Sequence, residues 1–219
     1  MSSTVDVYLE VTAKRSFACA VDWPGWDRAG RTPEDALAAL AAYASRYAVI
    51  AAEAGHPLAR GVPDLHVVER LEGTSGTGFG VPERLSRADA ADLTASEAGR
   101  RADLVAAAWT VFDRVVAAAP ASLRKGPRGG GRDRDKVVAH VVEAEASFYA
   151  RQLGLPVAHP DPADADAVAA VRGAIQEVLR AARSGAPLRE RGWTPRYAAR
   201  RIAWHVVDHA WEIEDRSES

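Results

Sequence analysis

The chain has 219 residues, of which 47% are hydrophobic and 26% charged, and its formal net charge is −2. These values are ordinary for a globular protein with a substantial core, and the length allows one large domain or two small ones. The nearly neutral balance argues against nucleic acid and against an anionic membrane as partners. A single cysteine, Cys19, excludes an internal disulfide and a thiolate metal cluster. Because no segment resembles a signal peptide or reaches about 18 apolar residues, we expect a soluble cytoplasmic protein.

The first part of the chain predicts a small α+β unit. Apolar residues alternate with polar ones over 5–11, which predicts a half-buried strand, and the same period over 17–23 predicts a second strand joined to it by a hairpin. The motif Thr32-Pro33-Glu34-Asp35 is typical of a helix start, and the Ala-rich run behind it predicts one helix that ends near Gly55. A third strand is expected around 65–71. The predicted order is therefore β-β-α-β.

A change of pattern follows this unit. Residues 72–93 are rich in glycine, serine and polar residues, and we expect them to form a linker. Behind them the hydrophobic period is helical. The sequence predicts a first helix of about 25 residues that begins after Thr94, and further helices over 133–153, 161–184 and 194–215. Such a series predicts an all-α, up-down four-helix bundle. The expected domains are 1–71 and 94–219.

Three of the six histidines lie on apolar helix faces. His205 and His209 are four residues apart on the last predicted helix, so their Cβ atoms would lie about 5–6 Å apart and both imidazoles could reach one ion. His140 lies on the apolar stripe of the second predicted helix. The alternative is that each is a core histidine with satisfied hydrogen bonds, although two neutral imidazoles are costly to bury without partners. Periodicity alone does not place His140 opposite the pair.

Acids near these histidines are candidates for supporting contacts. Metal-bound histidines usually donate their free N–H to an acceptor. Three acids follow the histidines at a spacing of three residues: Glu143, Asp208 and Glu212. Solvated acids on a helix surface are the alternative. Three protein ligands would leave coordination positions open, as is typical of a catalytic metal site.

A glycine-rich segment with several arginines precedes the helix that carries His140. Free backbone N–H groups and the helix dipole favour an anion at such a position. We therefore expect Arg128 and Arg132 to bind the carboxylate or phosphate of a substrate near the metal. The segment matches neither a P-loop nor a dinucleotide-binding fingerprint. A solvated loop without a ligand is the alternative.

The segments DKVVAHVVEAEASFYARQLG and WTPRYAARRIAWHVVDHAWEIEDR resemble the DinB-like (DinB/YfiT) superfamily, over roughly residues 94–216. The resemblance implies a four-helix bundle with one metal-binding histidine on the second helix and a histidine pair on the last. Matched residue by residue, it implies that His140, His205 and His209 bind one divalent ion, zinc first, with nickel or iron as alternatives. Some relatives carry Glu in place of one histidine of the pair, whereas this chain has His at both positions.

The stretch FACAVDWPGWDRAGRTPEDALAALAAY resembles the HicB-like fold, over roughly residues 5–71. The matching features are Pro24-Gly25, Gly30 and the helix start at 32–37. HicB-type antitoxins add a DNA-binding segment after this fold, whereas this chain continues into helices. The resemblance therefore implies an accessory or dimerising module, and it leaves a homodimer open.

Two functions are expected from these features. The first is a metal-dependent enzyme, because characterised DinB-like proteins include thiol-dependent transferases and isomerases. An Arg- and Ala-rich composition, typical of actinobacteria, favours mycothiol as the thiol and a small anionic or electrophilic molecule as the substrate. The second is a non-enzymatic fusion with a structural metal that acts in protein or RNA interaction. A metal pocket that opens beside the arginine-bearing loop would favour the enzyme, and a sealed one the structural role.

Overall fold

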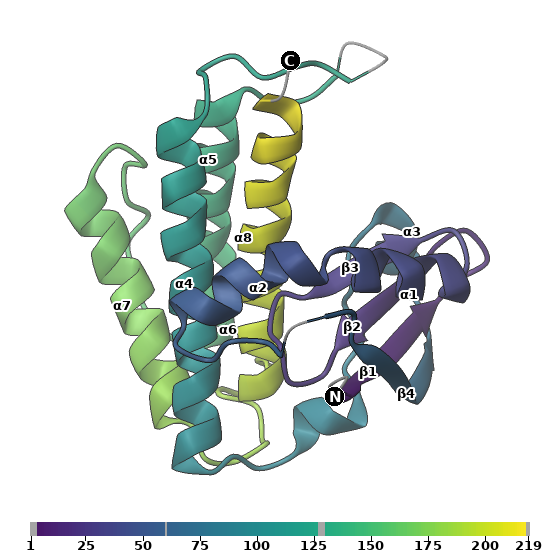
Figure 1. Ribbon diagram of the computed structural model, residues 1–219. Coiled ribbons are helices and arrows are strands. Elements are labelled where there is room, and N and C mark those ends of the chain that lie inside the picture. Colours follow the sequence, from purple (N-terminus) through teal and green to yellow (C-terminus); the bar gives the residue numbers. More distant parts are fainter. Residues whose placement is uncertain (1–3, 60, 127–129, 218–219) are drawn as a thin grey trace.

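The computed structural model describes residues 4–59, 61–126 and 130–217, and it shows an α+β protein (Figure 1). A four-stranded mixed sheet with helices comes first, and a helical part follows. The first part contains β1 (Thr4–Val11), β2 (Ser16–Ala20), β3 (Asp27–Gly30), α1 (Pro33–Ala42), α2 (Ala44–Glu53) and β4 (Asp64–Glu72). The strand order is β3-β2-β1-β4, in which β1 pairs antiparallel with β2 and parallel with β4, and β2 pairs antiparallel with β3.

Two features of this part differ from the expected β-β-α-β order. β3 lies where only a connection was expected, because a four-residue strand is too short to show an alternating pattern. The single helix expected after Pro33 is interrupted at Tyr43, where the backbone has φ −88° and ψ 3°. The interruption lets the two helices pack in different places, α1 on β2 and β3, and α2 on α4 of the helical part.

The segment expected to be a linker contains α3 (Ser75–Phe79) and a short 3-10 helix, η1 (Arg87–Ala90). Buried polar contacts hold it in place. The carboxylate of Glu10, on β1, is fully buried and accepts hydrogen bonds from the backbone N–H groups of Glu83 and Arg84, both at 3.2 Å. On the other side, Asp89 pairs with Arg200 at 2.9 Å. These contacts tie the segment to both parts of the chain, and polar residues make them rather than a hydrophobic pattern.

The helical part contains α4 (Ala95–Ala118), α5 (Arg134–Ala144), a π-helical turn (Glu145–Tyr149), α6 (Ala150–Gln152), α7 (Ala165–Ala181) and α8 (Pro195–Ser217). The segment from α5 to α6 is continuous and corresponds to the helix expected over 133–153. α7 begins later than expected, because Asp164 caps it through the backbone N–H of Ala167. α8 contacts α4, α5 and α7, and every residue from Pro195 to Val207 is buried.

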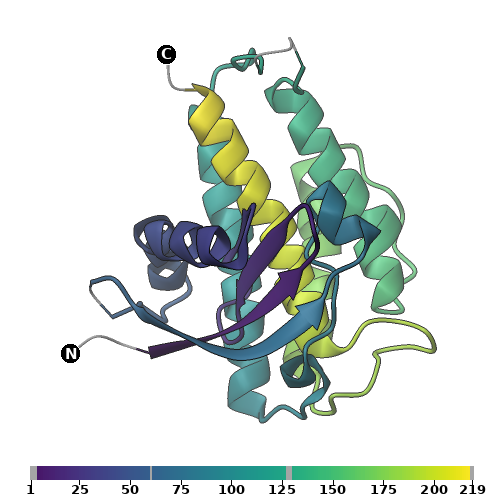
Figure 2. The same ribbon diagram turned by 90° about the vertical axis from the view of Figure 1, so that its right-hand side faces the viewer.

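α8 is buried this deeply because the sheet covers the side that faces away from α4. Figure 2 shows the strands lying across α8, and the Phe17 ring of β2 meets the Trp204 ring edge-on at 6.3 Å. A single cluster of buried hydrophobic side chains includes Leu40 and Tyr47 from the first part and Phe112 and Ile202 from the second. The two parts therefore share one core. Among the described residues, no helix combines the length and the apolar character that crossing a membrane requires.

Candidate metal centre

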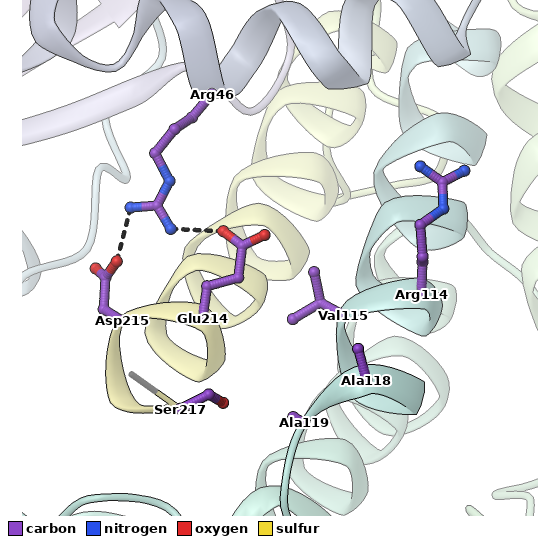
Figure 3. Close-up of a pocket in the computed structure, with 8 residues that line it drawn as sticks. All are labelled: Arg46, Arg114, Val115, Ala118, Ala119, Glu214, Asp215 and Ser217. Atoms are coloured by element: carbon purple, nitrogen blue, oxygen red, sulfur yellow. Dashed lines mark hydrogen bonds and ion pairs between the residues drawn. The ribbon is translucent and has the colours of Figure 1, made fainter. Parts of the chain in front are cut away.

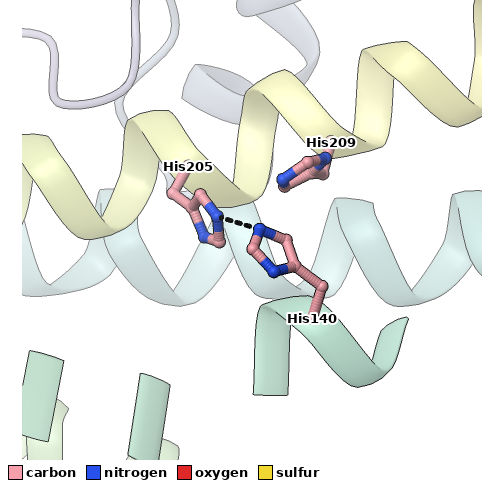
Figure 4. A group of neighbouring side chains, drawn as sticks. All are labelled: His140, His205 and His209. Atoms are coloured by element: carbon pink, nitrogen blue, oxygen red, sulfur yellow. Dashed lines mark hydrogen bonds between the residues drawn. The ribbon is translucent and has the colours of Figure 1, made fainter. Parts of the chain in front are cut away.

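The three histidines singled out in the sequence meet between α5 and α8 (Figure 4). The Nε2 atoms of His140 and His205 lie 3.2 Å apart. The ring of His209 lies 5.1 Å from that of His140 and 4.7 Å from that of His205, measured between centroids. One nitrogen from each side chain lies within 4.8 Å of the other two. The structure thus places His140 opposite the pair.

The local sequence explains why these side chains converge. His205 and His209 are one turn apart on α8, so they share a face of that helix. On α5, Val137 and Val141 flank His140 and are fully buried, which turns this side of the helix inward. The 3.2 Å separation also suits a shared ion. Two nitrogens that bind one tetrahedral ion at about 2.0–2.1 Å would lie about 3.3 Å from each other.

The surroundings favour uncharged imidazoles. Burial lowers the pKa of His205 well below its ordinary value, and the nearby histidines and arginines lower it further. Burial also lowers the pKa of His140, and the electrostatic influence of His209 and Arg132 lowers it further. The buried Nδ1 of His205 has no hydrogen-bond partner in the described chain. A neutral imidazole is the form that binds a metal ion, so these two side chains are held in the ligating state.

Of the three candidate acids, Glu212 contacts a histidine of the cluster. Its Oε2 lies 2.8 Å from Nδ1 of His209, and its Oε1 accepts a hydrogen bond from Arg216 at 2.6 Å. The contact with His209, with support from Arg216, lowers the pKa of Glu212 below its ordinary value. Asp208 instead forms an ion pair with Arg28 of β3 at 3.0 Å. Glu143 is exposed on α5.

The arginine-bearing loop lies beside this cluster. Arg132 is exposed, and its charge acts on both His140 and His205, whereas Arg128 lies outside the described residues. Other residues of the loop line a pocket of about 530 Å³ that reaches the acid bound to His209; the lining residues are Arg124, Lys125, Gly126, Gly130, Gly131, Glu212 and Arg216. The loop pocket, as we call this space, therefore opens next to the histidine cluster.

A second pocket, of about 690 Å³, lies where α2, α4 and the end of α8 meet (Figure 3). Arg46 spans its rim and pairs with Glu214 at 2.5 Å and with Asp215 at 2.8 Å. Both carboxylates of the rim are thus engaged by Arg46, and the floor consists of small apolar side chains of α4. The arrangement fastens α2 to the end of α8, and we assign no chemistry to it.

Sequence reasoning missed the residues on the other side of His205. The Tyr149 ring lies 5.5 Å from the His205 ring, and Trp193 and Tyr197 continue this aromatic group. Tyr149 ends the π-helical turn, a rare geometry that often occurs at functional sites. Arg201 lies one turn before His205 on the same helix. An arginine at this spacing inside an apolar stripe was visible in the sequence and could have been singled out.

Comparison of the chain with protein-family models, with curated proteins and with solved structures finds no match. The geometry of the histidine cluster, together with the resemblance of its two motifs, is therefore the basis for a functional proposal.

Proposed function

We propose that this protein is a metal-dependent enzyme of the DinB-like kind. Its helical part would be a four-helix bundle formed by α4, the α5–α6 segment, α7 and α8. His140, His205 and His209 would hold one divalent ion, with zinc as the first candidate. The observation that carries the proposal is the convergence of three imidazoles from two helices, with one nitrogen of each lying within 4.8 Å of the other two. A set of neutral nitrogen ligands suits zinc, nickel or iron.

The exposure of the cluster favours a catalytic ion over a structural one. Three protein ligands leave room for a further ligand. The side chain of His209 is 13% exposed and His140 is half-buried, so the cluster is not sealed in the core. The loop pocket reaches Glu212 directly beside His209. Open space on the side of the arginine-bearing loop therefore extends to the acid that contacts His209.

We further propose that the reaction is a thiol-dependent transfer or isomerisation, with mycothiol as the candidate thiol and a small anionic or electrophilic substrate. When bound, the ion would supply a Lewis acid that lowers the pKa of a thiol. The chain's own residues have separate tasks. The carboxylate of Glu212 holds the proton of His209 on Nδ1 and so leaves Nε2 free for the ion. The aromatic residues beside His205 exclude water from that side.

Cobalt substitution tests this proposal. The protein is loaded with Co²⁺ and titrated with N-acetylcysteine while its visible and near-ultraviolet absorption spectrum is recorded. A thiolate that joins the ion produces a new charge-transfer absorption, and N-acetylserine serves as the matched control that has no thiol. We expect the new absorption in the wild type and not in His205→Ala. A cobalt spectrum that N-acetylcysteine leaves unchanged would favour the non-enzymatic protein with a structural metal.

A further inference from the structure

Two neighbouring arginines of α8 are both buried, but among the described residues only Arg200 has hydrogen-bond partners. Arg200 donates through Nη2 to the carboxylate of Asp89 at 2.9 Å and to the carbonyl oxygen of Arg84 at 3.0 Å, although its Nε and Nη1 have no partner among the described residues. Arg201 is only 7% exposed, and its Nε and Nη1 are buried without a hydrogen-bond partner. Among the described residues, no carboxylate lies within ion-pair distance of Arg201. A buried charge without a partner is strongly unfavourable, so this residue calls for an explanation beyond stability.

Arg201 lies beside the histidine cluster. It precedes His205 by four residues and so shares its side of α8. Its charge acts on the imidazole of His205 and on the hydroxyl groups of Tyr149 and Tyr197. Its guanidinium carbon lies 4.7 Å from the centre of the Trp204 ring. The guanidinium therefore lies on the histidine side of α8, close enough for its charge to act on His205.

An aromatic group connects this position to the surface. The ring centroids of Tyr149 and Trp193 are 5.5 Å apart, and those of Trp193 and Tyr197 are 5.0 Å apart. At the outer end, Phe148 is 49% exposed and packs edge-on against Trp193 at 5.5 Å. The π-helical turn that carries Phe148 and Tyr149 brings both rings to this side. An apolar ligand body could lie along these rings.

We propose that Arg201 is the anion-recognition residue of the histidine site and that it binds the carboxylate of a small substrate with an apolar body. The planar guanidinium presents paired N–H donors that match a carboxylate. The aromatic group would hold the body of the substrate, and its reactive end would reach the three histidines. This inference rests on the proposed function, because it names the class of substrate that would reach the same site.

Asp27 on β3 is the carboxyl group of the protein itself that would compete with a ligand for the guanidinium of Arg201. Among the described residues, neither of its buried oxygens has a nitrogen or oxygen donor, and both the Cys19 thiol and Arg201 act on the carboxyl group. Burial raises the pKa of Asp27 to about 7, although Arg200 and Arg201 oppose the rise. A carboxyl group with this pKa is partly protonated at neutral pH, and Arg200 shares its charge. Asp27 therefore leaves the guanidinium of Arg201 available for a ligand.

Benzoate is a suitable probe, because it joins a carboxylate to an aromatic body, and benzamide is its neutral control. Both are titrated calorimetrically into zinc-loaded and into chelator-treated full-length protein. We expect benzoate to bind, benzamide to bind at least tenfold more weakly, and Arg201→Gln to lose at least tenfold in benzoate affinity with unchanged metal content. Arg180→Gln is the matched control, since Arg180 lies on α7, is 47% exposed and pairs with Asp103.

Melting temperatures and two further variants separate a loss of benzoate binding from a loss of stability and from an effect of Asp27. Arg201→Gln loses the contact with the Trp204 ring but no hydrogen bond or ion pair to the described residues, and it removes a buried charge, so it is expected to melt at or above the wild-type temperature. Arg201→Lys is expected to retain part of the affinity. Asp27→Asn should leave benzoate binding intact. Equal benzoate affinity in the wild type and Arg201→Gln, or no benzoate binding by the wild type, would overturn the assignment. Arg201-dependent benzoate binding by a protein that takes up no metal would support the assignment and contradict the proposed function.

Discussion

His209 donates a hydrogen bond from Nδ1 to the carboxylate of Glu212, which lies 2.8 Å away and one turn later on α8. Because the pKa of Glu212 is lowered, this carboxylate is ionised at neutral pH and acts as the acceptor. The contact fixes the tautomer of His209 and leaves the lone pair of Nε2 available. Arg216 holds the second oxygen of Glu212 and so keeps the carboxylate in place.

Replacing Glu212 tests the importance of this contact. Glu212→Gln keeps the shape of the side chain but removes its charge, and we expect zinc affinity to fall about 10- to 100-fold, as is usual for such supporting groups. Competition with a chromophoric chelator measures the affinity. Glu143→Gln is the matched control, since Glu143 is exposed on α5. The zinc affinity of this variant should equal that of the wild type. Equal affinities in the two variants would deny Glu212 this role.

The arginine-bearing loop leads to a second prediction. Replacing Arg128 and Arg132 together by Gln is expected to weaken the binding of inorganic phosphate. The free energy of unfolding should change by no more than about 0.5 kcal/mol, as for most surface substitutions. Calorimetric titration and thermal unfolding provide the two measurements. Arg191→Gln serves as the control, because Arg191 is an exposed arginine in the connection between α7 and α8. An unchanged phosphate affinity in the double variant would make the segment an ordinary solvated loop.

Asp27 leads to a prediction about pH. Its pKa is raised from 3.8 to about 7 by burial, opposed by Arg200 and Arg201, with smaller contributions from Asp89 and Cys19. The folded state therefore favours the protonated carboxyl. This contribution is fully present below pH 4 and is lost as the pH rises through 7. Relative to Asp27→Asn, the wild type should lose on the order of a few kcal/mol of unfolding free energy between pH 4 and pH 8.

Denaturant unfolding of metal-free wild type and of Asp27→Asn at several pH values measures this difference directly. The comparison cancels the titration of the histidines, which both proteins share. A constant difference across the range would show that Asp27 keeps an ordinary pKa in the folded protein.

The shared core leads to a prediction about the isolated helical part. The sequence predicts that residues 94–219 fold alone as a helical unit. In the full chain, however, Trp204 and Trp211 of α8 are covered by Phe17 and by Tyr43. Exposing these two rings should lower the free energy of unfolding by several kcal/mol. We therefore expect the fragment to be helical by circular dichroism but to melt well below the full chain. Equal melting temperatures would show that the sheet adds no stability.

The sequence predicts the pair of His205 and His209 because two residues four apart lie on the same face of a helix, and this face is apolar. Periodicity identified the face on which His140 lies, but only the resemblance placed that face opposite His205 and His209. The unusual position of Arg201 was hidden for another reason. Arg200 and Arg201 are equivalent in the sequence, and they differ because Asp89, more than a hundred residues earlier in the chain, reaches only one of them.

The fold shows the same limit of local patterns. Strands and helices with a clear period were predicted in type and approximate position. The short strand β3 carries too few residues for a period, and the interruption at Tyr43 depends on where α2 finds its partner, α4. The segment at 72–93 has no hydrophobic pattern, because polar side chains from outside it, such as Glu10 and Arg200, hold it in place.

The metal content of the purified protein tests the central claim most directly, by elemental analysis of the wild type and of His205→Ala. We expect close to one divalent ion per chain in the wild type and none in the variant. Binding at a thousandfold excess over Kd would add about 4 kcal/mol to the free energy of unfolding, so chelation should lower the melting temperature of the wild type but not of the variant. A wild type that contains no metal, and that added zinc, nickel or iron does not stabilise, would contradict the account and leave three neighbouring histidines without an ion.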